Sequence, residues 1–148
     1  MSFEKILCTN RKARYDYEVL DTIEAGIVLH GFEVKSLRDH KASLDGAYAV
    51  VENDEVWLIN AHIDEYKNTK NNFTKQEPKR KRKLLLHRSE IAKFAEKAEE
   101  KGHTLIPLSF YVSNNKIKVQ LAVCKGKQNY DKRQTIKDRD AARELKDF

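Results

Sequence analysis

The feature that most constrains the fold is a stretch near the end of the chain that alternates apolar and polar residues on both sides of a short polar turn. The apolar residues before the turn are Leu105, Leu108, Phe110 and Val112, and those after it are Ile117, Val119, Leu121 and Val123. A period of two is typical of a strand with one buried face. The sequence therefore predicts an antiparallel hairpin that turns at residues 113–116.

Further segments of the chain have the pattern of β-strands. Residues 47–51 and 55–59 flank Asn53-Asp54, which predicts a second hairpin. The alternation of residues 15–19 predicts a strand that continues through residues 27–29, with a turn or bulge at Ala25-Gly26. His30-Gly31 is expected to end it.

Two segments have helical spacing. Val34, Leu37 and Arg38 predict a short helix of about three turns that presents Lys35 and Arg38 to solvent. A second helix is predicted from residue 90 to about residue 101, with Ser89 as its N-cap and Gly102 at its C-terminal end. Its apolar stripe consists of Ile91, Phe94, Ala95 and Ala98.

These elements predict a mainly β protein with helices. We expect a small antiparallel OB-like β-barrel with two or three inserted helices, occupying residues 1–124. Residues 125–148 carry 8 Lys and Arg against 5 Asp and Glu and too few apolar residues for a buried face. We expect a basic C-terminal tail that is disordered when free and becomes helical when bound.

The positive charge is concentrated rather than uniform. The formal net charge is +6, yet residues 1–64 carry 7 Lys and Arg against 12 Asp and Glu. Residues 65–88 carry 9 against 2. Because the rest of the domain does not share this excess, the basic segment predicts binding to a polyanion such as nucleic acid.

Within residues 65–83 we expect a mobile loop that carries the run Lys79–Lys83. If all 5 residues of this run contacted phosphates, the salt dependence of binding would have a logarithmic slope of about −4. Tyr66 and Phe73 in the same segment are candidates for stacking on bases. The alternative interpretation of the run is a solvated surface loop.

The sequence argues against an enzyme. None of the 5 His residues pairs with Cys, Asp or Glu at a metal-site or nucleophile spacing, and the glycine-rich nucleotide motifs are absent. Cys8 and Cys124 form neither a metal-ligand spacing nor a disulfide framework. With no signal-peptide pattern and no long apolar run, we expect a cytoplasmic protein without membrane contact, cofactor or metal, acting as a monomer.

Several motifs then occur together in one order. They are Asn10-Arg11-Lys12-Ala13, Glu24-Ala25-Gly26-Ile27, Glu33-Val34-Lys35-Ser36-Leu37-Arg38, residues 78–86, and Gly126-Lys127 followed by Tyr130-Asp131-Lys132-Arg133. In order and spacing the chain closely resembles the SmpB family of bacterial tmRNA-binding (SsrA-binding) proteins, over nearly its whole length.

The resemblance implies an OB-like barrel that binds the tRNA-like domain of tmRNA and delivers it to stalled ribosomes for trans-translation. It implies that the tail enters the decoding centre, formed by 16S rRNA, and the mRNA channel. The expected RNA-binding residues are Asn10, Arg11, Lys12, Glu24, Lys35, Ser36, Arg38, Arg80, Arg82, Lys83, Leu85 and His87. The expected decoding-centre residues are Gly126, Lys127, Gln128, Tyr130, Asp131, Lys132 and Arg133.

Three residues depart from the family pattern. The family commonly has Lys where Gln128 stands, His where Tyr130 stands and Asn where His87 stands. Gln128 and His87 still form hydrogen bonds, and Tyr130 can stack on a base. Two other functions stay open from the residues alone, namely a generic OB-type single-strand binder and a nuclease or other RNA-modifying enzyme.

Overall fold

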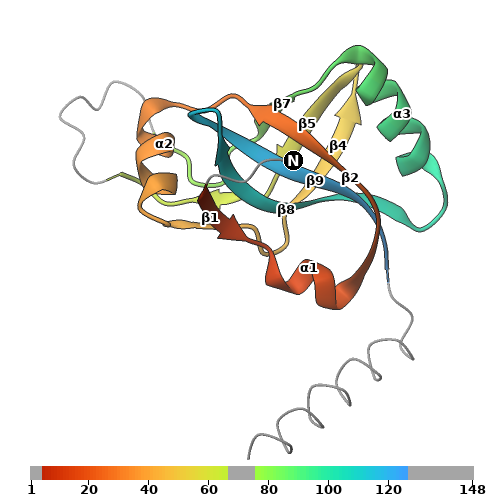
Figure 1. Ribbon diagram of the computed structural model, residues 1–148, viewed down its shortest axis with the longest axis horizontal. Coiled ribbons are helices and arrows are strands. Elements are labelled where there is room, and N and C mark those ends of the chain that lie inside the picture. Colours follow the sequence, from red (N-terminus) through yellow and green to blue (C-terminus); the bar gives the residue numbers. More distant parts are fainter. Residues whose placement is uncertain (1–4, 67–75, 127–148) are drawn as a thin grey trace, which may run out of the picture.

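The computed structural model describes residues 5–66 and 76–126, which form a curved sheet with three helices at its rim (Figure 1). The helices are α1 (Arg11–Asp16), α2 (Gly31–Arg38) and α3 (Arg88–Glu99). The strands are β1 (Lys5–Thr9), β2 (Tyr17–Ile27), β3 (Ala42–Ser43), β4 (Tyr48–Glu52), β5 (Glu55–Ile59), β6 (His62–Ile63), β7 (Arg82–Leu85), β8 (His103–Ser113) and β9 (Lys116–Gly126).

Seven strands form one antiparallel sheet in the order β1-β8-β4-β5-β7-β2-β9, and β9 also pairs with β8. The pairings thus return to β8 and give a partial ring, in which β4 contributes only the Ala49–Leu105 pair to β8. β3 and β6 form a separate two-stranded sheet. The predicted mainly β class with helices is confirmed, whereas a closed barrel of the OB type stays a prediction.

Both predicted hairpins are present, and asparagine-rich turns close them. Asn53 and Asp54 between β4 and β5 have φ of 52° and 62°, and Asn114 and Asn115 between β8 and β9 have φ of 51° and 60°. Two consecutive left-handed residues match the twist of the flanking strands, and Asn and Asp tolerate this conformation better than other side chains.

The main core fills the inner face of the ring, and a smaller cluster lies between α1 and the outer face of β8 and β9. A register shift between Pro107 and Ser109 changes which face of β8 each residue occupies. Leu105 and Phe110 therefore belong to the main core, while Leu108 packs in the smaller cluster. This shift explains why Leu108 and Phe110, although only two residues apart, lie on opposite faces of the strand.

The sequence interpretation missed two N-terminal elements. β1 pairs with β8, and α1 includes Tyr15 and Asp16, which were predicted to be in a strand. The Asn10 side chain accepts a hydrogen bond from the Ala13 N–H at 3.2 Å and so caps α1. The strand begins only at Tyr17.

Other predicted boundaries also shift. β2 runs without a turn through Ala25 and Gly26, and its irregularity lies between Val19 and Asp21. The N-cap of α3 is His87 rather than Ser89, and Gly102, with φ of 83°, follows the end of the helix. β2 ends at Ile27, before the expected break at His30-Gly31, where α2 begins instead; Lys35 and Arg38 on α2 are exposed as expected.

The last described strand reaches Gly126, which pairs with Tyr17. It therefore extends two residues beyond the expected domain boundary at residue 124, and the predicted tail from residue 127 onward lies outside the described residues. Within the described part of the chain, no helix is long and apolar enough to span a membrane.

Candidate nucleic-acid interface

The basic run Lys79–Lys83 is not a free loop, because its second half enters β7 and its charges meet carboxylates. Lys81 Nζ lies 2.8 Å from Glu52 and 4.7 Å from the centre of the Trp57 ring. Lys83 Nζ lies 3.2 Å from Glu55. These exposed pairs leave both lysines accessible but partly neutralised.

Arg82 is fully buried together with Glu33. The Arg82 side chain is 0% exposed and that of Glu33 is 3% exposed. Arg82 Nε donates to the Glu33 carboxylate at 2.7 Å, and the guanidinium also donates to the carbonyl oxygens of Ala61 at 2.7 Å and Pro78 at 2.9 Å. Arg80 completes the group, with its Nη2 atom 2.6 Å from Glu33. We call Glu33, Arg80 and Arg82 the buried ion cluster.

The buried ion cluster keeps Glu33 ionised. Burial by itself would raise the pKa of Glu33, but the hydrogen bonds from Arg80, from the His30 N–H and from Arg82 outweigh it and hold the pKa below its ordinary value. Burial lowers the pKa of Arg82, and the Glu33 charge opposes that change. The cluster links α2 to β7 and to the segment that precedes it.

Three expected RNA-binding residues are therefore structural in this fold. Arg82 is 0% exposed, so its guanidinium is not accessible to a phosphate in this arrangement, and its role in RNA binding stays a prediction. Asn10 is 4% exposed and, besides capping α1, donates to the Pro107 carbonyl oxygen at 2.9 Å. Ser36 is 1% exposed and donates to the Asp64 carbonyl oxygen at 2.7 Å.

Three other expected residues come together in one open hollow of about 450 Å³. It lies where β2, β7, β9 and the start of α3 meet, and we call it the Glu24 hollow. Its lining consists of Glu24, Gly26, Leu85, Leu86, His87, Glu90 and Lys118. The sequence resemblance selected Glu24, Leu85 and His87 from distant positions, and the sheet brings them together.

The register of the sheet explains this convergence. Gly26 on β2 pairs with Leu85 on one side and with Lys118 on the other. A Cβ atom at Gly26 would lie 3.2 Å from the Leu85 Cβ, so the glycine allows the Leu85 side chain to lie close against β2. Leu85 is nevertheless 51% exposed, which leaves an apolar surface open to a ligand.

The polar groups of the hollow suit the edge of a base. Glu24 accepts a hydrogen bond from the Tyr111 hydroxyl at 2.7 Å, and among the described residues no Lys or Arg forms an ion pair with it. Glu90 accepts from the His87 N–H at 3.0 Å and so fixes the start of α3. Carboxylate oxygens accept hydrogen bonds from base amino and imino groups, and an exposed leucine can pack on a base or ribose.

A groove beside the hollow supplies positive charge. It shares Gly26, Leu85 and Lys118 with the Glu24 hollow and is also lined by Arg38 and Lys116. We call it the Arg38 groove. Its floor contains Ile27, Leu29, Val34 and Ile117. Arg38, Lys116 and Lys118 therefore place positive charge beside the Glu24 hollow.

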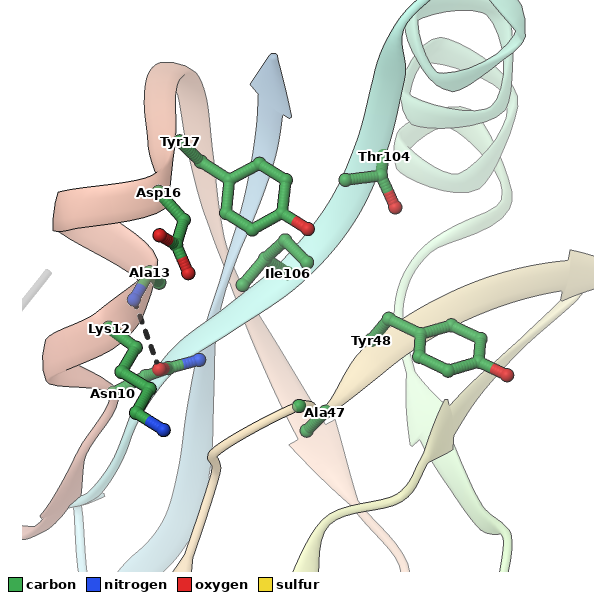
Figure 2. A pocket seen from close by; sticks show the side chains of 10 residues that line it. Asn10, Lys12, Ala13, Asp16, Tyr17, Ala47, Tyr48, Thr104 and Ile106 are labelled. Atoms are coloured by element: carbon green, nitrogen blue, oxygen red, sulfur yellow. Dashed lines mark hydrogen bonds between the residues drawn. The ribbon is translucent and has the colours of Figure 1, made fainter. Parts of the chain in front are cut away.

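A separate hollow of about 390 Å³ lies beside α1, and no residue lines both it and the Glu24 hollow. Figure 2 shows Asp16 and Tyr17 on one side of it, Ala47 and Tyr48 on the other, and Ile106 between them. Two expected RNA-binding residues, Asn10 and Lys12, line this second hollow. Five of the expected RNA-binding residues thus lie in two separate hollows.

The remaining expected residues fall outside both hollows or outside the described chain. Arg11 is exposed on α1, and Lys35 Nζ lies 5.3 Å from the centre of the Tyr66 ring. Gly126 is exposed at the end of β9. Phe73 and the decoding-centre residues Lys127, Gln128, Tyr130, Asp131, Lys132 and Arg133 lie outside the described residues.

Several contributors were not selected from the sequence, among them Lys116, which lines the Arg38 groove. Lys118 lines both the Glu24 hollow and the Arg38 groove. Its outward position follows from the alternation of β9, so this signal was available. Tyr111 approaches Glu24 from a strand that is distant in sequence, and no local pattern indicates that contact. In the described part of the chain, His, Cys, Asp and Glu form no group that could hold a metal, and both cysteines are unpaired.

Comparisons with known proteins show which family this chain resembles. The family described as SmpB protein matches residues 7–148. The SsrA-binding protein of Corynebacterium efficiens is 52% identical over 141 residues, covering 95% of this chain and 85% of that protein. The SsrA-binding protein of Rhodococcus jostii is 54% identical over 141 residues, covering 95% of this chain and 88% of that protein.

A solved structure shares the fold as well as the sequence. The chain in "tmRNA-SmpB: a journey to the center of the bacterial ribosome" is 42% identical, with a TM-score of 0.68 over 86% of this chain and 92% of that chain. The match of residues 7–148 and these relatives show that the chain belongs to the SmpB protein family.

Proposed function

We propose that this chain binds the tRNA-like domain of tmRNA through the Glu24 hollow and the Arg38 groove, and delivers the RNA to stalled ribosomes for trans-translation. The observation that carries the proposal is the meeting of Glu24, Leu85 and His87 in one open hollow next to Lys118. Support also comes from relatives named SsrA-binding protein and from the solved structure of tmRNA-SmpB.

In this proposal the side chains of the hollow and those of the groove contact different parts of the RNA. Glu24 and Leu85 contact bases or riboses, and His87 adds a hydrogen-bonding group at the start of α3. Arg38, Lys116 and Lys118 contact phosphates, with help from the exposed Arg11, Lys12 and Lys35. Arg80 and Arg82 serve the fold, because Glu33 already binds their guanidinium groups.

The proposal extends to the C-terminal residues and to the cellular setting. We propose that Gly126 and the residues after it act in the decoding centre and mRNA channel, that the partial ring corresponds to an OB-type barrel, and that the protein works as a cytoplasmic monomer without catalysis. Gly126 is exposed and is the last described residue of β9.

The binding proposal is tested by competition between two RNAs. We expect the full chain to bind the tRNA-like domain of tmRNA much more tightly than an RNA duplex of equal charge at physiological salt. Equal affinity for the two would contradict the proposal. Preference for an unstructured strand would indicate a generic single-strand binder, and RNA cleavage that EDTA abolishes would indicate a nuclease.

The role of the C-terminal residues is tested by truncation after Gly126. We expect the shortened chain to keep its fold and its RNA affinity, because β9 stays complete, and to lose the tagging of stalled peptides. Tagging at the parental level by the shortened chain would contradict this part of the proposal.

A further inference from the structure

A hydrogen bond that crosses an intervening strand connects Glu24 to the opposite side of β9. Tyr111 on β8 pairs with Lys118 of β9, and Glu24 on β2 pairs with Gln120 of the same strand. The Tyr111 hydroxyl donates to Glu24 Oε2 at 2.7 Å. This contact therefore joins two strands that are not neighbours in this part of the sheet.

The two partners differ in their exposure. Tyr111 is 0% exposed, whereas Glu24 is half-buried and lines the hollow. A buried ring has little rotational freedom, so its hydroxyl is held in one place. Burial raises the pKa of Tyr111, and the hydrogen bond to Glu24 raises it further, so the hydroxyl stays protonated and donates at neutral pH.

This geometry has a consequence for the carboxylate. A free glutamate side chain populates several rotamers. Restricting it to one rotamer on binding costs conformational entropy and so weakens the affinity for the ligand. The bond at Oε2 restricts Glu24 before any ligand arrives, and among the described residues no cation is paired with the carboxylate. Glu24 thus keeps capacity to accept further hydrogen bonds.

We propose that Tyr111 is a positioning residue that holds the Glu24 carboxylate in the orientation in which it accepts hydrogen bonds from base amino or imino groups of the bound RNA. The proposal rests on RNA binding by the Glu24 hollow. A carboxylate accepts hydrogen bonds and cannot donate them, so its fixed position selects base edges that carry donors.

A double-mutant cycle tests this inference with the full chain and a synthetic RNA of the tRNA-like domain of tmRNA. The variants are Tyr111→Phe, Glu24→Ala and the double variant, and the readout is the Kd of each. We expect Tyr111→Phe to raise the Kd about 2- to 10-fold, the loss expected when one side chain must be ordered on binding. In the Glu24→Ala background the same change has no effect.

The cycle separates positioning from support of the sheet. Phe retains the buried ring. Because both single changes break the same hydrogen bond, its contribution to stability does not cancel in the cycle, so the free energy of unfolding of all four proteins is measured by urea titration and each Kd is determined where the protein is folded. Ser109→Ala, which removes another buried hydroxyl from β8 at a residue that lines neither hollow nor the Arg38 groove, serves as the control and leaves the Kd unchanged.

The outcomes are distinguishable. An equal effect of Tyr111→Phe in both backgrounds would assign Tyr111 to the fold alone and overturn the inference. If Glu24→Ala weakens binding and Tyr111→Phe does not, the inference fails while the RNA-binding hollow stands. If Glu24→Ala leaves the Kd unchanged, the hollow itself is not the RNA site.

Discussion

Arg82 and Leu85 lie on the same short strand, and each occupies the environment that would be expected of the other. Arg82 is 0% exposed, and Leu85, three residues later, is 51% exposed. Successive side chains of a strand point to opposite faces, so β7 directs Arg82 and Leu84 inward and Lys83 and Leu85 outward. The comparison shows that strand register, rather than side-chain polarity, decides which residues of the basic segment are accessible on the surface.

The two environments are stabilised differently. An inward arginine must be accompanied by its counter-charge, which Glu33 supplies from α2. An outward leucine gains nothing from the fold, and its exposure is compatible with a role in binding. Variants at the two positions should therefore have separable effects.

The largest effect is expected for Arg82→Met. Removing the guanidinium leaves Glu33 with Arg80 as its remaining partner and takes the donor from the Ala61 and Pro78 carbonyl oxygens, and breaking a buried pair in this way destabilises proteins by about 3–5 kcal/mol. The free energy of unfolding from urea titration measures this loss. Lys81→Met is the control, because the pair with Glu52 is exposed and contributes about 1 kcal/mol or less. Stability within 1 kcal/mol of the parent for Arg82→Met would show that the buried ion cluster does not stabilise the fold.

The next largest effect is expected on RNA affinity for Leu85→Ala. Loss of an apolar contact at the centre of an interface weakens binding by about 1–2 kcal/mol, or roughly 5- to 30-fold. Because Leu85 is 51% exposed, the free energy of unfolding should change little. Gel-shift or fluorescence titration with the tRNA-like RNA provides the measurement. If Leu85→Ala binds the RNA with the affinity of the parent, Leu85 is not part of the RNA interface.

The buried ion cluster should also give stability a specific pH dependence. The pKa of Glu33 is lower in the folded protein than its ordinary value of 4.5, so its stabilising contribution is complete above that value. The contribution is lost as the pH falls through the folded pKa, because the unfolded chain then binds the proton more readily. Urea titrations between pH 7 and 3 should show a smaller loss for Glu33→Gln than for the parent. Parallel curves for the two proteins would contradict this assignment.

The smallest effect concerns the salt dependence of RNA binding. Lys118→Ala should reduce the magnitude of the logarithmic salt slope by about 0.7 to 0.9, the value expected for one phosphate contact. Lys81→Ala should leave the slope nearly unchanged, since Lys81 lies near Glu52 and Trp57, away from the hollow's lining residues. Equal salt slopes for Lys118→Ala and the parent would show that Lys118 does not contact a phosphate of the bound RNA.

Periodicity predicted the elements whose signal is local. The hairpin of β8 and β9 and that of β4 and β5 follow from alternation and from Asn-rich turns. By contrast, α1 was missed although Asn10 is a good N-cap, because the alternating residues 15–19 favoured a strand. The register shift in β8 was not predicted either, since it depends on the position of Pro107 in the sheet.

The candidate site was only partly predictable, because some of its contacts join residues that are far apart in sequence. Motif resemblance selected Glu24, Leu85 and His87, and the structure brings all three into one hollow. Composition selected Arg82 from the basic run, but its burial depends on pairing with Glu33, 49 residues away in sequence. Tyr111 was missed because its contact with Glu24 spans 87 residues.

The most direct test of this account measures two quantities on the same two variants, Arg82→Met and Glu24→Ala. The first quantity is the free energy of unfolding, and the second is the Kd for the tRNA-like RNA at a temperature where both variants are folded. We predict that Arg82→Met loses more stability than Glu24→Ala while its folded fraction retains RNA affinity, and that Glu24→Ala, which loses only the hydrogen bond from Tyr111, loses affinity. A reversed pattern, in which folded Arg82→Met binds RNA weakly and Glu24→Ala binds normally, would contradict the assignment of these two regions.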